Sequence, residues 1–154
     1  MKAKLVVMML ALCIAGVAVC FARSSMMGTW KLNEAKSKFG AGATKNSTVI
    51  YEAAGDSVKV TVEGTDTTGA TTHSDWTGKF DGKDYPVTGD PTSDARSYKT
   101  IDDHTLELTV KKGGKVTITG RIVTSADGKT RTLTVSRTDA AGKKVESTAV
   151  YDKQ

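Results

Sequence analysis

The sequence contains few of the residues on which metal binding and catalysis usually depend. It has two cysteines and two histidines in 154 residues, and both cysteines lie within the first 20 positions. A disulfide and a cysteine-based metal site are therefore excluded from residues 23–154. The two histidines, His73 and His104, lack converging partners. His73 has only Asp75 on its own face, which we interpret as a surface polar contact. No enzyme motif occurs, so we predict a non-enzymatic protein without metal or cofactor.

Long apolar runs are also missing, except for one at the N-terminus. Lys2 and Lys4 precede an almost wholly apolar stretch over residues 5–20. Cys20-Phe21-Ala22 then supplies small residues at the positions that a signal peptidase reads. The pattern predicts a secretory signal peptide over residues 1–22. The run is shorter than the roughly 20 apolar residues of a membrane span.

Removal of this leader leaves one domain, residues 23–154, which we expect to be exported, either periplasmic or secreted. The alternative is a lipoprotein acylated at Cys20. Without the leader, 20 basic residues face 17 acidic ones. This scattered, nearly balanced charge does not match a nucleic-acid surface, so we predict no nucleic-acid partner and no stable membrane span. The oligomeric state stays open.

Apolar and polar residues alternate through most of the remaining chain. Val58, Val60 and Val62, for example, alternate with polar residues, as in a strand with one buried and one wet face. We predict one short helical turn over residues 33–38, where Asn33 can cap it. We predict ten strands, over residues 27–32, 47–53, 57–64, 71–78, 84–88, 95–101, 105–112, 115–125, 130–138 and 145–152.

Glycine-containing turns separate these strands and favour tight hairpins. Helical crossovers, which a parallel sheet requires, do not occur. The fold class is therefore all-β, an antiparallel up-and-down meander. Closing such a meander into a barrel of about 8–10 strands removes its two exposed edges. Gly78 and Gly120 fall inside strands, where glycine often marks a bend or the close approach of another group.

The chain resembles a lipocalin-like (calycin) barrel through Gly28-x-Trp30 on the first strand, the helical turn after it, the hairpin meander and the closing segment 147–152. It is similar to small secreted bacterial lipocalin-like proteins that have no assigned activity. The resemblance covers most of residues 27–154. The resemblance implies that Gly28 and Trp30 have a structural role at one end of the barrel.

In lipocalins an arginine near the barrel end stacks on this tryptophan. Arg137 is our candidate, because it shares the parity of Leu133 and Val135 in its strand. The alternative is an exposed Arg137 paired with Glu146 or another acid. A guanidinium over an indole contributes about 0.5–2 kcal/mol.

Fatty-acid-binding proteins resemble the chain in length and at both ends. Their closing strand has an arginine two residues before a tyrosine, and this pair binds the lipid carboxylate. Here Tyr151 matches the tyrosine, but Ala149 stands where the arginine would be. Their helical lid also has no counterpart in this sequence.

The aromatic residues are the strongest candidates for a ligand site. They either fill the core, as aromatic residues commonly do, or line a cavity that small inward-facing residues leave open. The predicted function is an exported barrel that binds a small apolar or amphipathic ligand. The alternative is a secreted or envelope interaction or inhibitor module with a filled core that acts through its loops. The candidate cavity residues are Tyr51, Trp76, Phe80, Tyr98 and Tyr151.

Overall fold

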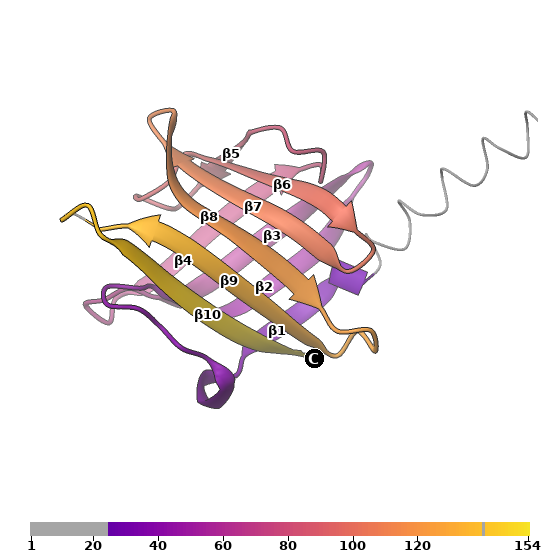
Figure 1. Ribbon diagram of the computed structural model, residues 1–154. Helices are drawn as coiled ribbons and strands as arrows, with labels where there is room; N and C mark the ends of the chain where they lie inside the picture. The colour runs from indigo at the N-terminus through magenta and orange to yellow at the C-terminus, as the bar shows by residue number, and fades with distance from the viewer. Residues whose placement is uncertain (1–24, 140) are drawn as a thin grey trace, which may run out of the picture.

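The computed structural model describes residues 25–139 and 141–154, and these form a closed, all-antiparallel barrel of ten strands (Figure 1). The fold class predicted from the alternation pattern is thus confirmed. The predicted signal peptide lies outside the described residues. Within the described part of the chain, no helix combines the length and hydropathy needed to cross a bilayer.

All ten predicted strands are present, and each end lies within two residues of its predicted position. The short helix η1, Glu34–Lys36, is a 3-10 turn that begins after Asn33, whose side chain accepts a hydrogen bond from the Lys36 amide. The strands are β1 Gly28–Leu32, β2 Lys45–Ala54, β3 Ser57–Thr65, β4 Thr71–Gly78, β5 Tyr85–Thr88, β6 Ala95–Asp102, β7 Thr105–Lys112, β8 Lys115–Thr124, β9 Thr130–Thr138 and β10 Lys144–Lys153.

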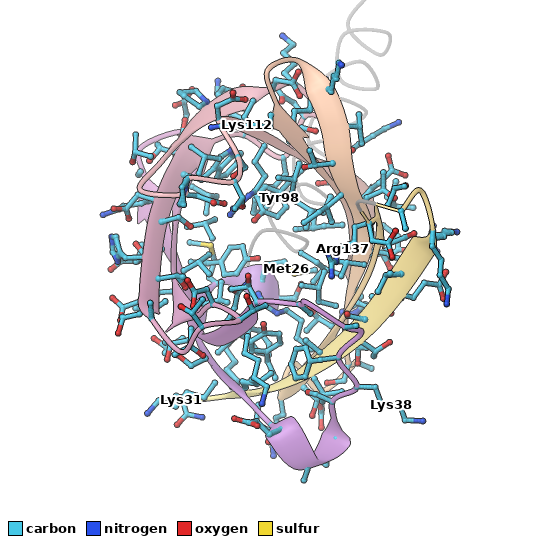
Figure 2. All side chains as sticks on the ribbon, turned by 90° about the vertical axis from the view of Figure 1, so that its left-hand side faces the viewer. Met26, Lys31, Lys38, Tyr98, Lys112 and Arg137 are labelled. Carbon is cyan, nitrogen blue, oxygen red and sulfur yellow. The ribbon has the colours of Figure 1, made fainter. Side chains whose placement is uncertain are left out.

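Every strand pairs with its neighbours in the sequence, and β1 pairs with β10 to close the barrel. We call the end at which β1 and β9 begin the base, and the opposite end the mouth. Figure 2 looks into the mouth, where the segment between β1 and β2 crosses part of the opening. Because β1 and β9 are both antiparallel to β10, they run in the same direction.

The strand register arranges the inward-facing side chains of β6 to β10 in rows, one below another from mouth to base. Such rows follow from the period of two in a strand and from cross-strand pairing. The row nearest the mouth is Arg96, Val110, Ile118, Arg137 and Val145; the next is Tyr98, Leu108, Gly120, Val135 and Ser147; the next is Leu106, Ile122, Leu133 and Ala149; the last is Thr124, Arg131 and Tyr151.

Candidate functional site

The base of the barrel is closed by Trp30 and by Met26, which precedes β1. Both side chains are almost completely buried. The indole Nε1 of Trp30 donates a 2.9 Å hydrogen bond to the Met26 carbonyl, and the Thr124 hydroxyl donates to the Met26 sulfur. Gly28 begins the strand with φ of 101°, a conformation that favours glycine, which is why this residue precedes the tryptophan. The predicted structural role of Gly28 and Trp30 at the barrel end is consistent with this arrangement.

The arginine that stacks on Trp30 is Arg131, at the start of β9. Its guanidinium carbon lies 5.0 Å from the Trp30 ring centroid, 5.0 Å from that of Tyr51 and 4.7 Å from that of Tyr151. The prediction that Arg137 stacks on Trp30 is therefore wrong. Arg137 is six residues further along the same strand, about 20 Å away in an extended chain.

The sequence did not single out Arg131. Odd or even position in a strand tells which face a side chain is on, but not how far it lies from the base of the barrel. Arg131 and Arg137 both alternate in step with Leu133, so both face inward and alternation cannot choose between them. The direction of the strands decides between them. Since β1 and β9 run the same way, the early residue Trp30 of β1 is level with the early residue Arg131 of β9.

The positive charge of Arg131 is not neutralised by an acid. Arg131 is 2% exposed, and no carboxylate in the described ranges lies within ion-pair distance of its guanidinium. Its Nε and Nη1 have no hydrogen-bond partner there. Burial raises the pKa of Tyr51 and of Tyr151, and this outweighs the opposing effect of Arg131, so both phenols are uncharged at neutral pH. Three aromatic faces are thus the main compensation for this buried cation.

The predicted cavity residues Tyr51, Trp76, Phe80 and Tyr98 form one aromatic cluster. Trp76 is stacked on Phe80 with centroids 6.3 Å apart and meets Tyr98 edge-on at 4.8 Å. Tyr51 contacts both Phe80 and Tyr98. The fifth residue, Tyr151, lies apart from this cluster and reaches Tyr51 through Arg131.

This aromatic cluster is closely packed on the β2–β6 side of the barrel. Trp76 is 1% exposed, and its Nε1 donates a 2.8 Å hydrogen bond to the Arg96 carbonyl. A Cβ added to Gly78 would lie only 2.5 Å from the Tyr85 ring and 2.7 Å from that of Trp76. The rings of Tyr85 and Trp76 therefore fill the space beside Gly78. Of the two roles predicted for this glycine, the close approach of another group fits and no cavity lies at this residue.

The inner wall formed by β8, β9 and β10 is covered less completely. Its inward-facing Ile118, Leu133 and Val135 are only half-buried, whereas the inward-facing valines of β3 are buried. The row between the mouth and Ala149 contains the small residues Gly120 and Ser147. The side chains on this wall are thus aliphatic or small and partly accessible. Val135 occupies the space beside Gly120, and the Ser147 hydroxyl accepts a 2.9 Å hydrogen bond from the Gly40 amide.

Two arginines face inward in the row nearest the mouth. Arg96 on β6 is buried and lies 3.8 Å from Asp90. Arg137 on β9 is half-buried, and one of its terminal nitrogens donates a hydrogen bond to the Ala41 carbonyl in the segment that crosses the mouth. The buried Nε of Arg137 has no partner in the described part of the chain. The predicted alternative, an exposed Arg137 paired with Glu146, does not fit this position, because Glu146 faces outward.

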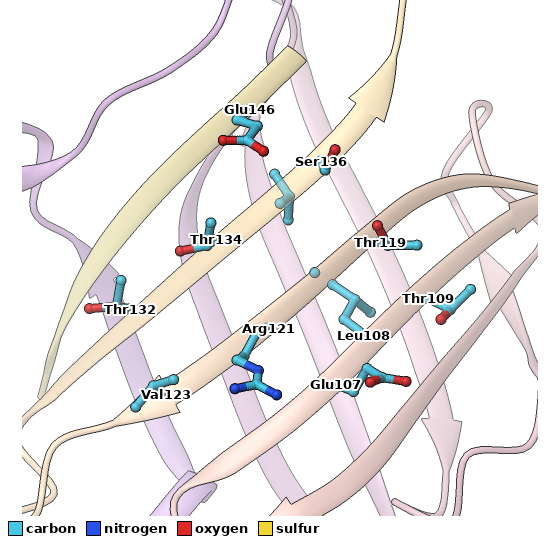
Figure 3. A pocket seen from close by; sticks show the side chains of 12 residues that line it. Glu107, Leu108, Thr109, Thr119, Arg121, Val123, Thr132, Thr134, Ser136 and Glu146 are labelled. Atoms are coloured by element: carbon cyan, nitrogen blue, oxygen red, sulfur yellow. The ribbon is translucent and has the colours of Figure 1, made fainter. Parts of the chain in front are cut away.

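A hollow of about 660 Å³ lies over β7, β8, β9 and the start of β10 (Figure 3), and its lining includes the inward-facing Leu108, Gly120 and Val135. Register places most of its lining on the outward-facing rows, where Arg121 is opposite Glu107. Five of its twelve lining residues carry a hydroxyl group, and none of the twelve is aromatic. Its residues are Glu107, Leu108, Thr109, Thr119, Gly120, Arg121, Val123, Thr132, Thr134, Val135, Ser136 and Glu146.

Comparison with known proteins gives a likeness of structure but none of sequence. No family model and no curated protein matches the chain. The solved structure of mFAP2b bound to DFHBI has 12% identity and a TM-score of 0.52, and the match covers 86% of this chain and 97% of that one. The S-type phycobiliprotein lyase CPES from Guillardia theta has 11% identity and a TM-score of 0.54, over 89% of this chain and 93% of that one.

At these identities the likeness shows the fold alone. The fold is a lipocalin-like β-barrel, and the match extends over most of the described residues. The coarser part of the resemblance seen in the sequence is therefore confirmed.

Proposed function

We propose that this protein is exported and is a non-enzymatic barrel that binds a small apolar or amphipathic molecule in its interior. The observation that carries the proposal is the uneven inner wall, which is filled by aromatic rings on the β2–β6 side and only half-covered on the β8–β10 side. Barrel interiors of this kind are common ligand sites. The structural likeness supports the proposal, because mFAP2b is bound to DFHBI in its solved structure.

The test is a titration of the purified protein with N-phenyl-1-naphthylamine, a neutral probe that fluoresces in apolar surroundings, together with native mass spectrometry. We expect saturable binding of the probe. Val135→Phe places a ring in the half-covered space and should weaken probe binding by about tenfold or more, a loss of at least ~1.4 kcal/mol. Thr134→Phe on the outward face is the matched control and should leave binding unchanged.

The second candidate is an interaction module with a filled core. The packed state of the aromatic cluster favours it, since Trp76 and Tyr98 are almost completely buried. Absence of probe binding, with a single ligand-free mass for the protein, would reject the first candidate and support the second.

A further inference from the structure

We infer that the ligand is an organic anion whose acid group binds Arg137 at the mouth and whose apolar part lies along the inner wall of β8 to β10. This inference rests on the proposed function and adds the chemical class of the ligand. It comes from the charge balance of the barrel interior, which the aromatic residues alone do not reveal.

Three arginines face the interior, namely Arg96, Arg131 and Arg137. One carboxylate, Asp90, lies within 4 Å of any of them in the described ranges, and it is 3.8 Å from Arg96. The interior therefore has an excess of positive charge. A buried cation without a counter-charge is costly, and an anion from outside the chain would reduce that cost.

Of the three, Arg137 is placed to meet a ligand. Arg131 is enclosed by Trp30 and two tyrosine rings at the base, and Arg96 already has Asp90. Arg137 is half-buried at the mouth, and Figure 2 shows it directed toward the interior of the barrel. Its Nε is buried and has no partner in the described part of the chain, and one terminal nitrogen already donates to the Ala41 carbonyl. An anion that displaces the atoms now covering the Nε could form a two-bond contact with it and a terminal nitrogen, through a carboxylate, sulfonate or phosphate.

The turns beside Arg137 carry charges of both signs. Lys112 and Lys115 flank the β7–β8 turn, and Lys143 precedes β10. Acids lie there too: Asp94 accepts a hydrogen bond from the Gly113 amide in the β7–β8 turn, Asp139 accepts one from the Lys143 amide, and Glu146 is 3.5 Å from Lys144. The charges of the turns therefore largely offset one another, and the attraction for an anion comes from Arg137 itself.

The wall below Arg137 provides the apolar contact. Ile118 is its register partner, and Val135 and Leu133 follow on β9 toward the base. The distance from Arg137 to Leu133 is about 13 Å along an extended strand. The site therefore suits a molecule with one acid group and an apolar body of about this length, such as an aromatic or aliphatic acid.

Two probes that share one ring system test this inference. 1-Anilinonaphthalene-8-sulfonate carries a sulfonate, and N-phenyl-1-naphthylamine lacks it. Arg137→Gln should weaken binding of the sulfonate by about 10- to 100-fold, as for loss of a charge-assisted hydrogen bond, and should change binding of the neutral probe less than about twofold. Arg137→Lys should restore much of the sulfonate affinity. Arg121→Gln, on the outward face of β8, is the matched control and should change neither affinity.

Equal weakening of both probes by Arg137→Gln, or no change in either, would overturn the anion inference and leave the proposed function standing. Binding of neither probe to the unmodified protein would overturn both. Thermal melts establish that each variant is folded. A salt titration needs no variant: the sulfonate affinity should fall as NaCl rises and the neutral-probe affinity should not. An affinity for the sulfonate that is independent of salt would contradict the inference.

Discussion

Trp30→Ala should be among the most destabilising single substitutions in this barrel. The side chain is 0% exposed, so truncation leaves a cavity at the base, and such changes cost about 3–5 kcal/mol. The substitution also removes the hydrogen bond to the Met26 carbonyl, which contributes about 1 kcal/mol. Arg131 loses one of its three aromatic faces as well. We therefore expect a total of about 4–6 kcal/mol, out of a typical stability of about 5–15 kcal/mol.

Urea denaturation monitored by far-UV circular dichroism measures this loss directly. A destabilisation of this size should lower the melting temperature by about 15–25 °C for a domain of this length. Trp30→Phe is the matched control, because it keeps a ring against Arg131 and loses only the Nε1 donor and part of the volume. It should cost about 1–2 kcal/mol.

A loss of less than about 2 kcal/mol for Trp30→Ala, or one no larger than that of Trp30→Phe, would contradict this prediction, because removing a completely buried ring from a rigid site costs more than that. The m-value must be unchanged for the comparison to hold.

Two further predictions rest on the geometry, and a third rests on the sequence of residues 1–22. Gly78→Ala should destabilise the barrel by about 1–3 kcal/mol, since the new Cβ would overlap the Tyr85 ring; a melt checks this. The hydrogen bonds that His73 donates to Asp75, and to a smaller extent to Glu63, raise the pKa of His73 above its usual 6.5. Their contribution to stability is thus fully present below pH 6.5 and is lost as the pH rises through the higher folded pKa. Asp75→Asn should lower the pKa of His73 toward 6.5 in an NMR titration, and an unchanged pKa would refute the assignment. N-terminal sequencing of exported protein should begin at Arg23, whereas an acylated Cys20 would replace this prediction with an anchored protein.

The strands could be predicted from the sequence because each one carries its own evidence. Alternation of apolar and polar residues defines a strand locally, and turn glycines define where it ends. Gly113 and Gly114, for example, both have positive φ in the two-residue turn between β7 and β8. Closure of the barrel also follows from local evidence, since a long twisted meander with short turns leaves two unpaired edges.

The charges inside the barrel could not be predicted in the same way. Arg96, Arg131 and Arg137 have the inward parity of their strands, but parity does not say which level each reaches or what surrounds it. Level depends on register, and β-bulges shift register without a clear sequence signal; one such shift lies between Val110 and Lys111. The aromatic residues around Arg131 come from β1, β2 and β10, so this contact depends on the closed fold.

The distribution of aromatic residues along the chain explains why the two sides of the interior differ. The segment from residue 99 to residue 150 contains no Phe, Tyr or Trp. This segment supplies the end of β6, all of β7, β8 and β9 and most of β10, whose inward positions hold aliphatic or smaller side chains apart from the two arginines of β9. The aromatic cluster instead comes from residues 51–98 on the opposite wall. A barrel of fixed strand number encloses a nearly fixed width. With large rings on one wall and small side chains on the other, the ligand space that we propose lies beside β8 to β10. Arg137 lies above that space at the mouth, so the position at which a ligand would fit and the position of the unpaired donor coincide.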